Sequence, residues 1–249
     1  MSLRSLVSAG VAAAVLALAT PSARAAEPSD LEIALGLSQL LQSARAVVSA
    51  EQDLINDPTR GDKGLTGDVV LARGLENFKQ TTGIDVRTID PGSRYGKLID
   101  AEMNAIRNTM ADVQSSINKQ GLGFKGFVPA VFGRMVTEHF QQLAGRDAAI
   151  KVTAPPEIVR NRKALPDEFE IEAIRTKLLA ADWQTGKVYA LDAKKGNRDA
   201  YRVLVPEYYT QGCLSCHGGP KGELDITGYP KEGGKLGDLG GVISVTLYR

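Results

Sequence analysis

The spacing of apolar residues changes partway along this chain, and that change limits the folds it can adopt. Before about residue 145, apolar residues recur every three or four positions, the period of helices that bury one face. After about residue 146, short stretches alternate apolar and polar residues, as half-buried strands do. Helices followed by short antiparallel strands predict an α+β fold. We therefore expect a helical region at 26–145 and a sheet-containing domain at 146–249, packed as one compact unit.

The periodicity also predicts individual elements. The expected helices are Leu31–Asp57, Thr66–Thr82 with Thr66 as its cap, Tyr95–Asn118, Val128–Ala144 and Glu168–Ala181. The expected strands are Ala149–Thr153, Lys187–Asp192, Ala200–Val205 and Gly241–Tyr248, with a hairpin turn at Lys194–Asn197.

Residues 1–25 have the pattern of a secretory signal peptide. Arg4 precedes the apolar stretch Leu6–Ala19, and small residues at Ser22–Ala25 predict cleavage after Ala25. The stretch is shorter than the roughly 20 residues of a comfortable membrane span, although an uncleaved anchor is the alternative. No later segment is apolar enough to cross a membrane, so we expect a protein of the periplasm. The formal net charge of +1 gives no electrostatic footprint for nucleic acid.

The two cysteines of the chain lie in a short motif that indicates a specific chemistry. Cys213 and Cys216 are three positions apart, and His217 follows directly. In a Cys-x-x-Cys-His motif, both thiols form thioethers with haem vinyl groups and the histidine binds the iron. We therefore expect one covalent haem c, attached through both cysteines, with His217 as the proximal iron ligand.

Three other interpretations of the cysteines are weaker. A structural zinc site uses four protein ligands, and His139 is the only histidine outside the motif. A redox-active disulfide places its first cysteine at a helix N-terminus, but Gly218-Gly219-Pro220 is poor helix-forming sequence. A structural disulfide between such close cysteines closes a small loop and stabilises little.

Several motifs together resemble a known protein family. They are Cys213–Pro220, Gly228-Tyr229, Gly237–Gly241, Ile243–Val245, Arg160-Asn161 and Pro166–Glu170, with weaker similarity at Leu54–Asp57 and Gly61–Thr66. They are similar to the PAS-like c-type haem proteins, formerly catalogued as a domain of unknown function, and to their exported single-domain branch.

The resemblance implies a small antiparallel sheet of PAS-like fold that cradles one haem, preceded by long helices. It carries Cys213, Cys216 and His217 over as attachment and proximal residues. Family members occur as secreted proteins and as sensory modules of receptors, which implies a redox or ligand-sensing role. Some of them use an upstream cysteine as the distal iron ligand. This chain has no such cysteine, so its distal position is another protein group, a water or vacant.

His139 and Met135 are the candidate distal ligands. Both fall on one predicted helical stripe with Phe132, Val136, Phe140 and Leu143. The alternatives are a hydrogen-bonded core histidine and simple methionine packing. Met103 and Met110 have the pattern of core residues, with a ligand role as the alternative. A strong sixth ligand favours electron transfer, whereas an open site admits small gases.

Other candidate cofactor-binding residues lie between the predicted strands. Arg160 or Arg162 is a candidate partner for a haem propionate, because arginine binds carboxylates in bidentate fashion; a solvated basic surface is the alternative. Tyr208 and Tyr209 are candidates for a propionate contact or for packing on the porphyrin, with ordinary core packing as the alternative.

These observations predict a periplasmic monohaem cytochrome that is an electron carrier or a redox-responsive protein with a redox partner protein. The alternative is a haem-based sensor that binds a small gaseous ligand and acts through a partner protein. No catalytic residues are predicted, since a peroxidase would place a base and a cationic side chain over the iron and no such pair is evident.

Overall fold

The computed structural model describes residues 28–249, so the predicted signal peptide at 1–25 lies outside the described residues. The first half of this range is helical. Its helices are α1 Asp30–Ala50, α2 Gln52–Asn56, α3 Gly67–Thr82, α4 Arg94–Ile117 and α5 Pro129–Ala144. None of the helices in residues 28–249 combines the length and apolar character that a membrane span demands.

Side-chain caps fix where these helices begin. Ser29 forms a capping box with Glu32 at the start of α1, and the hydroxyls of Thr66 and Ser93 accept from the first turns of α3 and α4. The helix predicted over Leu31–Asp57 is divided, because α1 ends at Ala50 and the separate short helix α2 begins at Gln52. Asp57 is extended, as the residue before a proline usually is.

The second half forms one antiparallel sheet in the order β1-β4-β3-β2. The strands are β1 Ala148–Thr153, β2 Tyr189–Lys195, β3 Arg198–Tyr208 and β4 Leu239–Tyr248. The β2–β3 hairpin turns at Gly196, whose φ of 59° is in the left-handed region that glycine tolerates. The fold is therefore α+β, as predicted.

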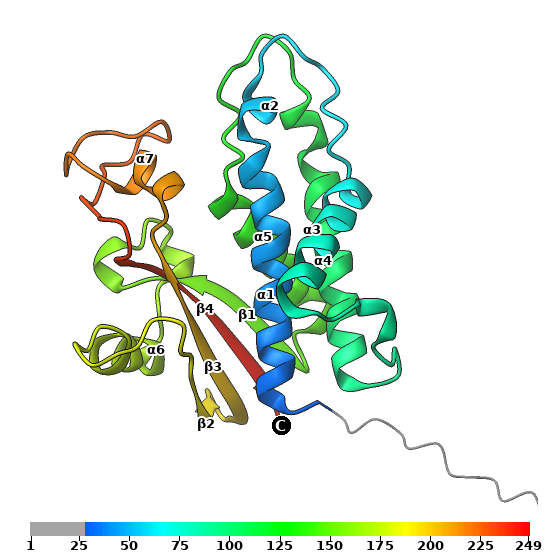
Figure 1. The fold of residues 1–249 in the computed structure, drawn as a ribbon, viewed down its shortest axis with the longest axis vertical. Coiled ribbons are helices and arrows are strands. Elements are labelled where there is room, and N and C mark those ends of the chain that lie inside the picture. Colours follow the sequence, from blue (N-terminus) through cyan, green and yellow to red (C-terminus); the bar gives the residue numbers. More distant parts are fainter. Residues whose placement is uncertain (1–27) are drawn as a thin grey trace, which may run out of the picture.

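Helices cover both faces of the sheet (Figure 1). On one face α1 and α5 pack on the strands, and Val203 and Val245 join the hydrophobic core of the helices. On the other face Leu204 and Val242 pack with α6, Glu168–Ala173, and the π-helical turn Ile174–Leu178. The helix predicted over Glu168–Ala181 is thus shorter and ends in a π turn. The helical and sheet regions share one core.

A buried ion-pair cluster anchors α6 to the sheet. Arg202 is 2% exposed and donates to Asp167 at 2.7 Å and Glu170 at 3.3 Å, while its guanidinium lies 4.1 Å from the centroid of the Phe169 ring. Asp167 and Glu170 also form the capping box of α6. The Pro166–Glu170 motif is therefore structural, since its acids cap the helix and neutralise a buried arginine.

Candidate functional site

The cysteine motif lies on a short helical turn at the end of β3. The 3₁₀ turn η5, Gln211–Cys213, leads into α7, Leu214–His217, where the sequence predicted a loop (Figure 1). Residues three apart on a helical turn project to the same side, so Cys213 and Cys216 share a side of α7. Both are half-buried free thiols with no disulfide between them.

The imidazole of His217 is held by a carboxylate. Its Nδ1 lies 2.9 Å from Oε2 of Glu232, and the side chain is 29% exposed. An ionised carboxylate only accepts hydrogen bonds, so Nδ1 carries the proton and donates it to Glu232. The lone pair of the neutral imidazole is then on Nε2, the nitrogen that is left to bind a metal.

Tyr209 fixes the face of the same imidazole. Its ring stacks on His217 with centroids 5.2 Å apart and an interplanar angle of 21°. A Cβ added to Gly234 or Gly240 would lie 2.4 or 2.2 Å from this ring, so both positions require glycine. Burial raises the pKa of Tyr209 to about 12. Its hydroxyl is buried and has no hydrogen-bond partner among residues 28–249.

Arg160 joins the carboxylate to the motif helix. Its Nε and Nη2 donate to the two oxygens of Glu232 at 2.6 and 3.0 Å, and Nη2 also donates to the Cys216 carbonyl at 2.8 Å. Burial favours the neutral form of Glu232, but hydrogen bonds from Arg160 and His217 outweigh this effect and lower its pKa. Glu232 is therefore ionised at neutral pH.

A second carboxylate fixes Arg160 from the other side. The fully buried side chain of Asp225 accepts from Nη1 of Arg160 at 2.6 Å. Its other oxygen accepts from the Thr227 amide and hydroxyl and from the Tyr229 amide, at 2.6–3.1 Å. Burial opposes ionisation of Asp225, yet these hydrogen bonds hold its pKa far below the usual range.

Comparison with known proteins identifies the family. The family model of Tll0287-like proteins matches residues 34–247, which is most of the chain. The chain belongs to the Tll0287-like family. No curated protein and no solved structure matches it.

The structure places the predicted residues of this Tll0287-like protein in different surroundings. Arg160 is at the motif, but its donors are engaged by Glu232, Asp225 and the Cys216 carbonyl instead of being free for a propionate. Arg162 is exposed at the start of the 3₁₀ turn η3, Arg162–Ala164. Tyr208 packs with Leu204 and Val242 on the α6 side of the sheet, and its hydroxyl accepts from Trp183 Nε1 at 3.1 Å. Tyr209 is therefore the tyrosine of the site. A propionate contact by these residues stays a prediction.

The two candidate distal ligands lie on α5. Nε2 of His139 is 2.9 Å from Asp112 of α4, and both His139 and Met135 are half-buried. Leu143 is 51% exposed, so the stripe that the periodicity predicted reaches the surface instead of being an entirely buried face. The structure thus gives His139 a carboxylate partner, and a ligand role for His139 or Met135 stays a prediction. Met110 is fully buried in the main core, as expected.

Sequence reasoning missed Glu232, Asp225 and an apolar rim beside the motif. The loop 218–238 folds back onto α7, where the Gly234 amide donates to the His217 carbonyl at 2.8 Å. Within this loop Leu224, Ile226, Tyr229 and Leu236 are 48–67% exposed. Exposed apolar side chains gain free energy when an apolar group covers them. A porphyrin attached to α7 is compatible with this setting, because the loop that contacts α7 carries these exposed apolar side chains.

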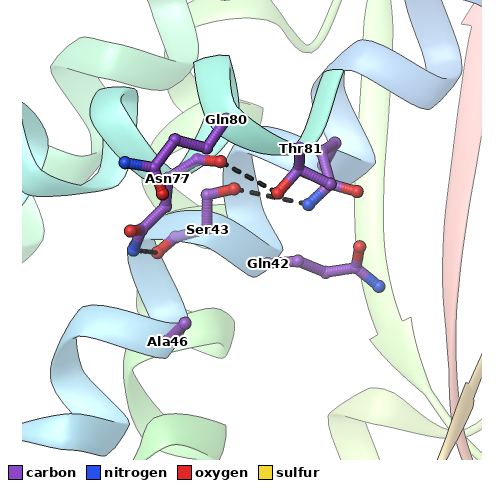
Figure 2. Close-up of a pocket in the computed structure, with 7 residues that line it drawn as sticks. Gln42, Ser43, Ala46, Asn77, Gln80 and Thr81 are labelled. Carbon is purple, nitrogen blue, oxygen red and sulfur yellow. Dashed lines mark hydrogen bonds between the residues drawn. The ribbon is translucent and has the colours of Figure 1, made fainter. Parts of the chain in front are cut away.

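A cavity elsewhere in the protein does not include these residues. It lies between α1 and α3 and is lined by Gln39, Gln42, Ser43, Ala46, Asn77, Gln80 and Thr81 (Figure 2). Asn77 donates to the Ser43 carbonyl at 3.3 Å, and Thr81 donates to the Asn77 carbonyl at 2.9 Å. Its uncharged polar lining contains no cysteine or histidine. Within residues 28–249 no group of three or more His, Cys, Asp or Glu side chains is arranged to hold a metal ion.

Proposed function

We propose that this protein is an exported monohaem c-type cytochrome of PAS-like fold, which acts in the periplasm as an electron carrier or redox-responsive protein. The observation that carries the proposal is the arrangement on one helical turn of Cys213, Cys216 and His217. The two thiols share a side, and the imidazole keeps its lone pair on Nε2 because Nδ1 faces Glu232. Family membership and the α+β fold are consistent with it.

Each residue of the motif has a separate task in this proposal. Cys213 and Cys216 hold the haem through thioethers, and Nε2 of His217 binds the iron. When bound, the haem supplies one-electron chemistry through its ferric and ferrous states. Glu232 fixes the rotation of the His217 ring from its edge, and Tyr209 fixes it from its face. The exposed apolar rim of the loop 218–238 would shield the porphyrin from water.

Co-expression with the cytochrome c maturation machinery tests the proposal. The full chain should be purified and its visible spectra recorded in both oxidation states, followed by a haem stain after denaturing electrophoresis. We expect haem that survives denaturation in the wild type and in Ser215→Ala, which leaves the cysteines intact. We expect no such haem in the Cys213→Ala, Cys216→Ala double variant. Wild-type protein without covalent haem would contradict the proposal.

Carbon monoxide separates electron transfer from the second candidate function, a haem-based gas sensor. If carbon monoxide does not change the visible spectrum of the reduced protein, the iron is six-coordinate and the electron-carrier function is supported. A rapid spectral change on addition of carbon monoxide indicates an open or labile distal site. That result contradicts the electron-carrier function and supports the gas-sensor function.

A further inference from the structure

The hydrogen bond from His217 to Glu232 has an electronic consequence for any metal on Nε2. An anionic acceptor on the Nδ1 proton makes the imidazole a more basic and more strongly donating ligand. Stronger donation stabilises the ferric state relative to the ferrous state. We propose that Glu232 is a positioning residue that orients His217 and lowers the reduction potential of the haem iron. The proposal rests on the proposed function of haem binding.

The geometry holds Glu232 in place for this role. Arg160 grips both carboxylate oxygens, and buried Asp225 holds Arg160 from the opposite side. The loop that carries Glu232 is bonded to the motif through two backbone contacts, from Gly233 to the Gly218 carbonyl at 3.0 Å and from Gly234 to the His217 carbonyl at 2.8 Å. Donor and acceptor therefore belong to one connected unit, and little conformational freedom is lost when their hydrogen bond forms.

Arg160 opposes part of the effect of Glu232. Oε2 of Glu232 accepts from His217 Nδ1 at 2.9 Å and also from Arg160 Nη2 at 3.0 Å. A carboxylate that shares one oxygen between two donors gives less negative charge to each of them. Arg160 thus both positions the carboxylate and moderates it, and the two residues form one unit that sets the basicity of His217.

The test compares Glu232→Gln with Glu223→Gln in the haem-loaded protein. Both changes remove one negative charge from the same loop, but Glu223 is 54% exposed and pairs with Lys231 at 3.6 Å, away from His217. In Glu232→Gln the amide oxygen at the Oε2 position still accepts from Nδ1 of His217 and Nη2 of Arg160, while the amide NH2 replaces the acceptor of Arg160 Nε; the ring of His217 keeps its acceptor and the negative charge is lost. The readout is the midpoint potential from spectroelectrochemical titration.

We expect Glu232→Gln to raise the ferrous-to-ferric ratio at a fixed electrode potential about tenfold, which corresponds to about 59 mV for one electron. Glu223→Gln should shift the midpoint potential several times less than Glu232→Gln does. Equal shifts in the two variants would overturn the inference, because net charge alone would then explain the effect. A fall in potential in Glu232→Gln would also overturn it.

Two measurements distinguish failure of this inference from failure of the proposed function. Absence of covalent haem in the wild type refutes haem binding itself and, with it, the role of Glu232. Haem that is attached and redox-active in all three proteins, with one common potential, leaves the cytochrome proposal intact and refutes only the role of Glu232. Thermal unfolding of each variant establishes that the compared proteins are folded.

Discussion

The ring of Tyr209 stacks on the imidazole of His217, and its backbone continues directly from β3. The nitrogen that is available to a metal therefore has its direction set by the sheet as well as by the carboxylate at Nδ1. Rigid support of this kind holds a ligand in its binding geometry before the metal or cofactor arrives.

The hydroxyls of the two adjacent tyrosines should have opposite effects on stability in the haem-free chain. The Tyr209 hydroxyl is buried without a hydrogen-bond partner in the described residues, whereas Tyr208 accepts from Trp183. Removing an unsatisfied buried hydroxyl relieves a desolvation penalty of about 1–3 kcal/mol. Tyr209→Phe should therefore leave the free energy of unfolding unchanged or raise it, and Tyr208→Phe should lower it by about 1 kcal/mol. Urea unfolding of both variants measures this, and a lower stability for Tyr209→Phe alone would contradict it.

The glycines around Tyr209 should be intolerant of a methyl group. An added Cβ at Gly240 would lie 2.2 Å from the tyrosine ring, while one at Gly219 would meet nothing within 4 Å. Gly240→Ala should destabilise the protein by about 1–3 kcal/mol through overpacking, and it should reduce covalent haem yield because the ring supports His217. Gly219→Ala is the matched control within the same site. Equal thermal stability and haem yield in the two variants would show that the tyrosine is not confined by Gly240.

Glu102 should make the protein less stable as pH rises. Burial in α4 raises its pKa well above the ordinary value, and neither of its oxygens has a partner among the described residues. The unfolded chain releases this proton above about pH 4.5 while the folded chain keeps it. Stability should then fall by about 1.4 kcal/mol per pH unit up to the folded pKa.

Glu102→Gln removes the titrating carboxyl group. The free energy of unfolding of the variant should therefore depend less on pH above about pH 4.5 than that of the wild type. The difference in free energy of unfolding between Glu102→Gln and the wild type should therefore grow from pH 5 to pH 8 in favour of the variant. Glu76→Gln, on the exposed surface of α3, should show no such trend. A constant difference for Glu102→Gln would mean that Glu102 ionises alike in both states.

The buried arginine of the sheet should be costly to remove. Arg202 neutralises Asp167 and Glu170, and Glu170 is 1% exposed. Arg202→Leu removes the cation that the two acids share and leaves Asp167 with Lys195 and Glu170 with Lys151, so we expect a loss of about 2–3 kcal/mol in the free energy of unfolding. Arg198→Leu is the control, because Arg198 is exposed at the first residue of the same strand. A loss below about 1 kcal/mol for Arg202→Leu would show that the lysine partners alone neutralise the two acids.

The sequence was sufficient to predict the four long helices and the approximate places of the strands, because these depend on local signals, but it did not predict the short helix α7 or the break between α1 and α2. Thr66 caps α3 as expected, and Asp57 before Pro58 ends α2. The exact side-chain directions at the end of β3 were not predictable. A register shift between Glu207 and Tyr208 breaks the simple alternation of the strand, and Tyr208 and Tyr209 then enter different environments.

The partners of His217 were also beyond local signals. Glu232 follows His217 by 15 residues and meets it only because the loop folds back on α7. Arg160 is 72 residues from Glu232, and their contact depends on the whole domain being folded. Arg160 was a candidate partner for a propionate, but residue type alone did not distinguish a propionate from two protein carboxylates.

The mass of the purified, denatured protein tests the central claim most directly. Thioether attachment predicts a species equal to the polypeptide without residues 1–25 plus one haem, and this addition should disappear when Cys213 and Cys216 are both replaced by alanine. A wild-type mass equal to the bare polypeptide, obtained from cells with an active cytochrome c maturation system, would contradict the account.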